Sequence, residues 1–160
     1  MTQLQVAGSL VTRGDQPLGN RCPVDRAMQV VGNRTTMLLL REAFYGATRF
    51  EQLTRRVGVT EGVAAQRLRE LVDAGLLTKR PYREEGSRTR HEYVLTESGH
   101  ALLPAVMALF EWGETWTSRG RTTRALTHAD CGARVHVVAR CEEGHDVPED
   151  ELVVTSGGAR

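Results

Sequence analysis

The sequence predicts a mainly α-helical fold of the α+β class, a winged helix-turn-helix with a small β-wing. Between residues 22 and 75, apolar residues recur at helical spacing in segments that end at glycines. Residues 76–95 have the pattern of two strands around a charged tip. A final helix then carries more apolar surface than one small domain has to bury, which indicates a dimer, and a valine-containing segment predicts a small C-terminal β-rich tail.

The length and composition indicate one main core with a small appendage. With 160 residues, 40% of them hydrophobic and 26% charged, the chain suits a globular domain of ordinary size. No apolar run approaches the roughly 18 residues of a membrane span, and the N-terminus lacks the layout of a secretory signal. We therefore expect a cytoplasmic protein with no membrane partner.

Changes in composition along the chain indicate four segments. Residues 1–20 contain three glycines and a proline without lasting periodicity, which is typical of a mobile leader. We predict the winged helix-turn-helix and dimerisation domain over residues 21–117, a polar and basic linker over 118–127, and a small extension over 128–160. Three valines, Val135, Val137 and Val138, predict a strand in this extension.

Two helices are expected before the helix-turn-helix. Pro23 suits a first helical turn, and apolar residues repeat at helical spacing from there to Gly32. The hydroxyl residues Thr35 and Thr36 then open a densely apolar segment, which predicts a mostly buried helix that ends at Gly46.

The next two helices have the pattern of a helix-turn-helix. Thr48 is expected to cap the first of them, and Gly58 to end it. Thr60 is expected to cap the second, which ends at Gly75. The inward apolar stripes are Phe50, Leu53 and Val57 on the first helix, and Ala64, Leu68, Leu71 and Val72 on the second.

A β-hairpin and a long helix are expected to complete the domain. Residues 76–83 and 90–95 are two strand patterns around a flexible, charged tip over residues 84–88. Thr96, followed by Ser98 and Gly99, opens a single long helix. Its apolar residues form a very broad surface: Leu102, Leu103, Val106, Leu109, Phe110, Trp112 and Trp116.

The charge distribution and the order of the elements favour double-stranded DNA as a partner. The net charge is only +1, but residues 1–100 carry 15 Lys+Arg against 11 Asp+Glu, whereas residues 101–160 carry 6 against 9. In a winged helix-turn-helix, the second helix of the turn enters the major groove, and the wing approaches the backbone or the minor groove. We therefore predict that the helix from Thr60 to Ala74 contacts base edges.

Nine residues are predicted to contact DNA. Gln66 suits adenine, Arg67 or Arg69 suits guanine or phosphate, and small residues beside them permit close approach. The candidates are Thr60, Gly62, Ala65, Gln66, Arg67 and Arg69 on the helix, and Arg83, Arg88 and Arg90 on the wing. Two alternatives remain open: the arginines can form an ordinary solvated face, and winged helices also serve as protein-interaction modules without DNA affinity.

Several motifs in a fixed order make residues 22–116 similar to the HxlR family. The motifs are Cys22-Pro-Val24, Arg49-Phe50, Arg67-Leu-Arg-Glu-Leu71, Ala74-Gly-Leu-Leu77, Glu92-Tyr-Val-Leu-Thr96 and Trp112-Gly113. The resemblance implies a winged helix-turn-helix transcription regulator, related in fold to MarR proteins, that acts as a repressor. The chain departs from the family in two places, because Asn33-Arg34-Thr35 replaces Gly-Lys-Trp and Gly86 stands in a wing that often carries proline.

The resemblance also implies that two copies pair through their N- and C-terminal helices. The predicted interface residues are Pro23, Val24, Ala27, Leu102, Val106, Leu109, Phe110 and Trp116. Such a homodimer would bind a pseudo-palindromic operator with its two recognition helices in successive major grooves. A small-molecule effector of unknown identity, or a modified cysteine, would act by favouring one spacing of these helices.

The three cysteines are an odd number without an export signal, so they predict no disulfide framework. Cys22 matches a cysteine that senses oxidants or electrophiles in some HxlR-type regulators. Its position at a helix start favours the thiolate. The alternative is a half-buried residue that packs at the dimer interface.

The C-terminal extension carries a candidate zinc site. His128 and Cys131 precede the valine-rich segment, and Cys141 and His145 follow it, so that a zinc-knuckle-like hairpin could hold a structural zinc ion. Two alternatives remain open: Cys131 and Cys141 can face each other across a hairpin, or the four residues can be unrelated. The C-x₃-H half also lacks the usual C-x₂-C spacing.

No motif indicates an enzyme. The sequence contains neither a glycine-rich phosphate loop nor a nucleophile motif, and the pairs Glu84-Glu85 and Glu142-Glu143 fall in predicted turns. We therefore expect a transcription regulator without catalytic activity. Besides the protein-interaction module, the remaining alternative is a metal or redox sensor that acts through the Cys/His tail.

Overall fold

A computed structural model describes residues 4–83, 89–117 and 124–155 of the chain. By internal contacts the chain divides into two units, which we describe separately: Asn20–Arg124, and Met1–Gly19 together with Ala125–Arg160. Among the described residues, none of the helices combines the length and the apolar character that a membrane crossing requires.

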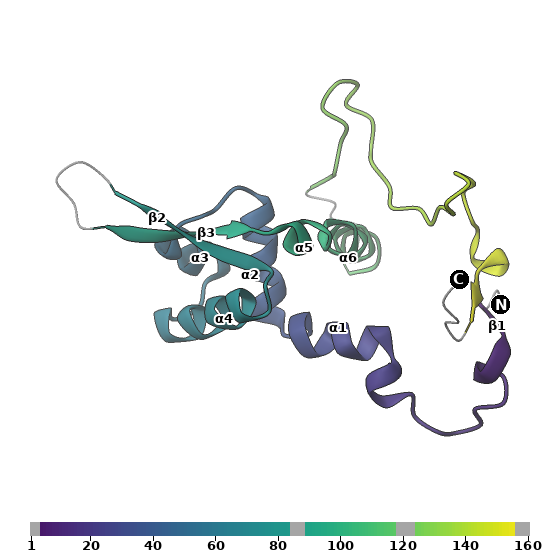
Figure 1. Cartoon of the computed structure of the whole chain (residues 1–160). Helices are drawn as coiled ribbons and strands as arrows, with labels where there is room; N and C mark the ends of the chain where they lie inside the picture. The colour runs from purple at the N-terminus through teal and green to yellow at the C-terminus, as the bar shows by residue number, and fades with distance from the viewer. Residues whose placement is uncertain (1–3, 84–88, 118–123, 156–160) are drawn as a thin grey trace. The chain divides into compact units, whose positions relative to one another are not determined.

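The unit Asn20–Arg124 is a winged helix-turn-helix (Figure 1). Among its described residues, four α-helices precede the hairpin and two follow it. In chain order the elements are α1 (Pro23–Val31), α2 (Arg34–Phe44), α3 (Phe50–Val57), α4 (Glu61–Asp73), β2 (Leu77–Tyr82), β3 (Arg90–Leu95), α5 (Glu97–His100) and α6 (Leu103–Trp116). A 3-10 turn, η2 (Gly19–Arg21), comes before α1.

The core of this unit consists mainly of leucines from α2, α3 and α4. Leu39, Leu40, Leu53 and Leu68 have no exposed surface. Leu71 and Leu77 are also buried, and the partly buried Phe50, Val57 and Val72 pack against the same cluster. The predicted inward stripes of α3 and α4 are therefore confirmed.

The first two helices follow the prediction closely. α1 has Pro23 in its first turn and ends before Gly32. α2 is capped by Asn33 rather than opened by threonine, because the Asn33 Oδ1 accepts hydrogen bonds from the backbone N–H of Thr35 at 2.9 Å and of Thr36 at 3.4 Å. The residue that departs from the family pattern thus has a capping role here.

The predicted cap of α3 is wrong, whereas that of α4 is confirmed. Arg49, not Thr48, is the N-cap of α3, and it makes no side-chain capping hydrogen bond. Thr48 is engaged by the wing instead: its carbonyl accepts from the Tyr93 N–H at 2.7 Å, and its side chain bonds the Glu92 carboxylate. Thr60 Oγ1 accepts from the Val63 N–H at 3.4 Å, as expected of an N-cap.

The hairpin β2–β3 is antiparallel, with a register from Leu77 opposite Leu95 to Tyr82 opposite Arg90. It projects beyond the helices in Figure 1. Arg80 lies opposite Glu92, and its Nε donates to the Glu92 Oε1 at 2.8 Å. The predicted hairpin is thus confirmed, while its tip over residues 84–88 lies outside the described residues.

The single long helix predicted after Thr96 is wrong. The chain instead forms α5 and α6, separated by a turn at Ala101 and Leu102. Pro104 lies in the first turn of α6, where its missing N–H is tolerated, but in a continuous helix that position would have to bond to the His100 carbonyl. Thr96 does cap α5 by accepting from the Gly99 N–H at 3.1 Å.

The second unit joins the two ends of the chain. β1 (Gln5–Val6) pairs in parallel with β4 (Val153–Val154), and the turns η1 (Gly8–Leu10) and η3 (Glu149–Glu151) lie beside them in sequence. No named strand covers Val135 to Val138, so this strand prediction is wrong for the described residues: isolated bridges join Thr127 to Arg134 and Arg140 to Asp146 on either side of them, and Val138 is 60% exposed. None of the described residues of this unit is buried.

Replacement of a core leucine tests the packing of α4. We expect Leu68→Ala to lower the free energy of unfolding by about 2–5 kcal/mol, because it removes buried methyl groups and leaves a cavity. Urea denaturation followed by circular dichroism measures this loss. Val63→Ala, at a 43% exposed position of the same helix, is the control and should change it by less than roughly 0.5 kcal/mol. Equal effects of the two substitutions would contradict the assigned orientation of α4.

Acidification tests the hydrogen bonds of Glu92 within the wing. The Arg80 guanidinium, and next the Thr48 side chain, lower the pKa of Glu92 below its ordinary 4.5. A lowered folded-state pKa stabilises the fold above the unfolded pKa, and this contribution disappears as the pH falls through the folded value. We expect stability to decline below pH 4.5 and the decline to be shallower in Glu92→Gln. Urea midpoints between pH 6 and pH 3 would show identical slopes if Glu92 had no such role.

Candidate nucleic-acid interface

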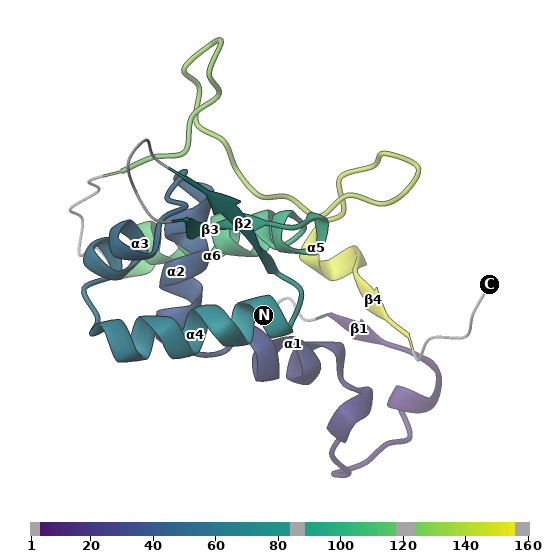
Figure 2. The same cartoon turned by 60° about the vertical axis from the view of Figure 1, so that its left-hand side comes forward.

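The turn between α3 and α4 sets the start of the recognition helix α4. Gly58 has a φ of 73°, in the left-handed region that favours glycine, and ends α3. Two residues later Thr60 caps α4. In the view of Figure 2, α4 lies along one edge of the helical unit, below α2 and α3. This helix is therefore at the surface along its length.

The structure places Thr60 at the N-cap of α4 and the other five predicted contact residues on the helix, with Gly62, Gln66 and Arg69 on its outer side. Gly62, Gln66 and Arg69 are exposed, as is Thr60 at the cap, whereas Ala65 and Arg67 are partly buried. The opposite side of the helix is buried at Ala64, Leu68 and Leu71. Small residues near the N-terminus of α4 leave its backbone open to close approach, which suits entry into a major groove.

The polar side chains of α4 form a hydrogen-bonded network. Gln66 Nε2 donates to Glu70 Oε1 at 2.8 Å, and Arg67 Nη1 donates to Glu70 Oε2 at 2.6 Å. Arg69 Nη2 donates to Gln66 Oε1 at 2.8 Å. We call these four residues the α4 polar network. It holds two guanidinium groups and one amide, the groups that read guanine, phosphate and adenine.

Glu70 is a functional candidate that was not predicted from the sequence. The hydrogen bond from Gln66, and next the one from Arg67, lower the pKa of Glu70. Its position four residues after Gln66 and three after Arg67 is the signal that could have identified it. The Glu70 carboxylate therefore orients the side chains of Gln66 and Arg67.

Two of the predicted wing residues lie next to the tip of the hairpin, at the end opposite to Leu77 and Leu95. Arg83 is exposed just after β2, and the exposed Arg90 begins β3, where its Nη1 lies 3.5 Å from Glu51 Oε1 of α3. Arg88 lies outside the described residues. The Arg49 guanidinium lies over the Tyr82 ring, 4.5 Å from its centroid, and thus joins the start of α3 to the wing. The sequence indicated no such contact.

The predicted dimer residues lie on α1 and α6, two helices with exposed apolar surface, except for Leu102, which is the N-cap of α6. Pro23, Val24 and Ala27 are exposed on α1, and Leu109 and Trp116 are exposed on α6, while Leu102, Val106 and Phe110 are partly buried. The exposed fraction reaches 69% for Val24 and 74% for Trp116. Met28 and Trp112, which were not among the predicted interface residues, add to this surface. Apolar surface of this extent is typical of an interaction site.

Cys22 is the N-cap of α1. Its Sγ accepts a hydrogen bond from the Asp25 N–H at 3.5 Å, and the residue is partly buried with a free thiol. The position at a helix start agrees with the sequence-based expectation. Partial burial also permits the alternative role, that of a packing residue.

The structure brings the predicted zinc ligands together only as two pairs. His128 Nδ1 lies 3.4 Å from Cys131 Sγ, and Cys141 Sγ lies 3.6 Å from His145 Nδ1. Within residues 4–83, 89–117 and 124–155, no three Cys, His, Asp or Glu side chains converge as metal ligands. The four-residue zinc site is therefore not assembled, and Cys131 and Cys141 are free thiols rather than a disulfide.

Known proteins with a similar sequence or structure are transcription regulators. The HxlR-like helix-turn-helix family matches residues 30–121. An HTH-type transcriptional regulator of Mycobacterium bovis is 43% identical over 110 residues, which cover 68% of this chain and 68% of that protein.

Two solved structures extend the comparison. PA1607, a candidate transcription factor, is 32% identical with a TM-score of 0.74, over 86% of this chain and 96% of that chain. The reduced form of the redox regulator HypR is 30% identical with a TM-score of 0.54, over 62% of this chain and 95% of that chain. Together with the exposed α4 polar network, these matches show that the chain belongs to the HxlR family of DNA-binding helix-turn-helix transcription regulators.

Proposed function

We propose that the protein is a homodimeric repressor that binds a pseudo-palindromic operator. The observation that carries this proposal is the α4 polar network, exposed on a helix whose other side is fixed by buried leucines. In this mode Gln66 and Arg69 contact base edges in the major groove, and Arg67 contacts a base or a phosphate. Arg83, Arg88 and Arg90 of the wing contact the phosphate backbone.

The apolar surfaces of α1 and α6 support the proposed dimer. Val24 and Met28 on α1, and Leu109, Trp112 and Trp116 on α6, are each more than half exposed. A second copy would remove this surface from water, which would stabilise the dimer by roughly 25 cal/mol for each Å² of apolar surface buried. A two-fold dimer then presents two recognition helices to half-sites about 34–36 Å apart.

Repression follows from the family resemblance rather than from a feature of the site. A dimer that occupies two major grooves within a promoter excludes other proteins from that DNA. Neither repression nor binding to the operator requires the protein to catalyse a reaction.

Replacement of Arg69 tests the DNA interface. We expect Arg69→Ala to weaken binding to the operator by about 1–3 kcal/mol, because the helix loses a base-contacting guanidinium. Fluorescence anisotropy with a duplex identified by sequencing captured genomic fragments measures the affinity. The logarithm of the association constant should also fall linearly with the logarithm of the salt concentration. The slope should be about −0.9 for each phosphate that the protein neutralises.

Arg13→Ala serves as the control for Arg69→Ala, since Arg13 is an exposed arginine of the other unit. It should leave the affinity unchanged. A wild-type protein with no preference for any duplex over random competitor would refute the proposed function. Salt-insensitive retention of a protein partner would point to an interaction module instead.

Substitution on α6 tests the dimer. We expect the wild-type protein to sediment as a dimer and the variant Leu109→Ser/Trp116→Ser as a monomer at micromolar concentration, because the substitutions remove exposed apolar side chains from the proposed interface. Sedimentation velocity separates the two states. Val138→Ser, at a 60% exposed valine of the other unit, is the matched control and should remain dimeric. A monomeric wild-type protein would contradict this part of the proposal.

We further propose that oxidation of Cys22 regulates the binding of the protein to its operator. It is supported by the position of the thiol at the start of α1 and by the similarity to the redox regulator HypR. Hydrogen peroxide would oxidise the Cys22 Sγ to a sulfenic acid and be reduced to water. Because α1 belongs to the proposed dimer surface, the added oxygen would disturb the pairing of the two copies.

Peroxide titration tests this role of Cys22. We expect treatment to weaken operator binding by about ten-fold, reversibly with dithiothreitol, and Cys22→Ser to abolish the response. Anisotropy measured before and after treatment gives the change. The double variant Cys131→Ser/Cys141→Ser controls for the two exposed thiols and should respond as the wild type does. An unchanged response in Cys22→Ser would exclude Cys22 as the sensor.

A further inference from the structure

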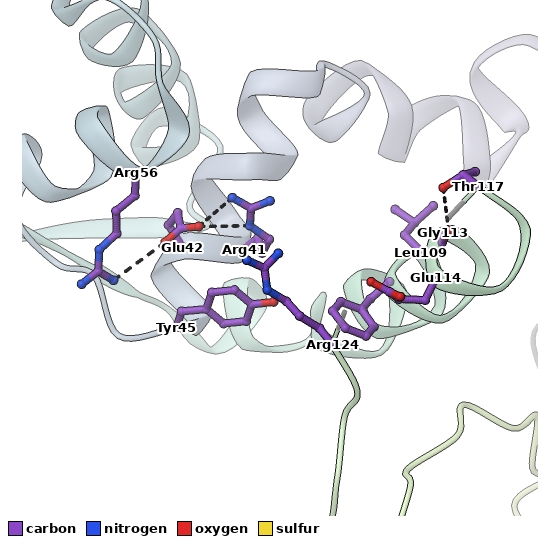
Figure 3. Close-up of a pocket in the computed structure, with 10 residues that line it drawn as sticks. Arg41, Glu42, Tyr45, Arg56, Leu109, Gly113, Glu114, Thr117 and Arg124 are labelled. Carbon is purple, nitrogen blue, oxygen red and sulfur yellow. Dashed lines mark hydrogen bonds and ion pairs between the residues drawn. The ribbon is translucent and has the colours of Figure 1, made fainter. Parts of the chain in front are cut away.

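A cavity of about 750 Å³ lies between α2, α3 and α6 of the helix-turn-helix unit (Figure 3). Small-molecule sites in proteins typically have volumes of about 300–1,000 Å³. None of the described residues that line the cavity belongs to α4, so it is separate from the candidate DNA interface. The candidate DNA interface therefore does not account for the function of this cavity.

A buried carboxylate positions two arginines at this cavity. Glu42 is 6% exposed, and its Oε1 accepts from the Nη2 of Arg41 at 2.6 Å and from the Nε at 3.1 Å. The other oxygen, Oε2, lies 3.8 Å from the Arg56 Nη1. Because a guanidinium has five N–H donors, Arg41 and Arg56 retain donors that are not directed at Glu42. The buried carboxylate is thus already neutralised by the two cations that it orients.

Arg124 brings a third guanidinium to the cavity and has no ion pair among the described residues. Glu114 is the other acidic residue of the lining. Because Arg41 and Arg56 already serve Glu42, and Glu114 has an interaction of its own, Arg124 is the cation that favours a ligand with one negative charge. A carboxylate is the group that a guanidinium binds best in this setting, through two parallel hydrogen bonds.

The remaining lining is apolar and aromatic. Tyr45, the C-cap of α2, is 52% exposed and Leu109 of α6 is 57% exposed, and Phe110 lies beside Leu109 in the lining. Figure 3 shows Arg41 and Tyr45 on one side of the space, and Leu109, Gly113 and Glu114 on the other. Gly113 leaves room along α6, since a Cβ there would meet only Thr117 Oγ1, at 3.9 Å. Rings and open space together suit a flat, apolar ligand body.

We propose that this cavity binds a small aromatic monocarboxylate. The guanidinium groups of Arg124 and Arg41 bind the carboxylate, and the ring of the ligand packs against Tyr45, Leu109 and Phe110. The ligand thereby joins α2 and α3, which support the recognition helix, to α6, which carries the proposed dimer surface. Leu109 belongs to both the cavity and that surface, which gives a bound ligand a route to the dimer. Ligand binding changes the affinity for DNA only if the DNA-binding dimer and the free dimer bind the ligand unequally. This regulatory consequence rests on the proposed function, whereas the binding itself does not.

Calorimetric titration of the full-length protein tests the proposal, with 1-naphthoate as the probe. We expect one site per chain, and affinity at least about ten-fold higher for 1-naphthoate than for the neutral 1-naphthamide, because only the carboxylate bonds the guanidinium groups. Acetate, which has the charge without the ring, should show no binding. Equal binding of the acid and the amide, or no heat with 1-naphthoate, would overturn the proposal.

Two variants place the ligand in the cavity by different means. Arg124→Gln removes a cation and should weaken 1-naphthoate binding by about ten-fold, while the exposed Arg13→Gln of the other unit should leave it unchanged. Gly113→Leu should abolish binding by filling the space, and sedimentation velocity checks that the oligomeric state is preserved. If Gly113→Leu changes the oligomeric state, the affinity of Arg124→Gln for 1-naphthoate alone decides whether the ligand binds in the cavity. Unchanged affinity in Arg124→Gln would overturn the assignment.

Operator binding measured on the same samples separates this inference from the proposed function. A protein that binds the operator but not 1-naphthoate overturns only the cavity assignment. A protein that binds 1-naphthoate with the expected variant pattern, but prefers no duplex, supports the cavity assignment and overturns the DNA-binding proposal.

Discussion

The burial of one side of α4 against the leucines of α2 and α3 is the constraint on which the candidate DNA interface depends. Leu68 has no exposed surface and Leu71 has 1%. Because residues three and four positions apart share a face of a helix, burial of these leucines directs Gln66 and Arg69 outward. The hydrophobic core therefore orients the polar surface, and the cap at Thr60 sets where that surface begins.

The polar groups on this surface already have partners within the helix. Glu70 accepts from Gln66 and Arg67, which restricts the rotamers that these side chains sample before DNA arrives. Contact with DNA would exchange these hydrogen bonds for bonds to bases and phosphates. A base that offers no matching acceptor would not compensate for the lost bonds, so in the proposed DNA-binding mode the network would contribute to discrimination between bases as well as to orientation.

The same core leaves the surfaces of α1 and α6 uncovered, and it leaves a cavity beside them. α6 packs on α2, yet none of its residues is buried. Glu42, on α2, is buried close to the core and holds Arg41 and Arg56 at the cavity rim. A change at α6 can therefore reach the helices that carry the recognition helix through direct packing. The unit formed by β1, β4 and residues 125–155 has no comparable core.

Local patterns in the sequence determined the helices α1 to α4, where α4 begins, the hairpin of the wing, and the inward leucines of α3 and α4, whereas the break between α5 and α6 was not predicted. These features depend on neighbours within a few residues, so propensity, capping and periodicity are sufficient to predict them. Contacts between distant residues required the tertiary structure: the use of Thr48 by the wing, the pairing of Gln5 with Val153, and the separation of the two Cys/His pairs. The cavity likewise exists only where α2, α3 and α6 meet, because the side chains that line it come from segments that no local pattern relates.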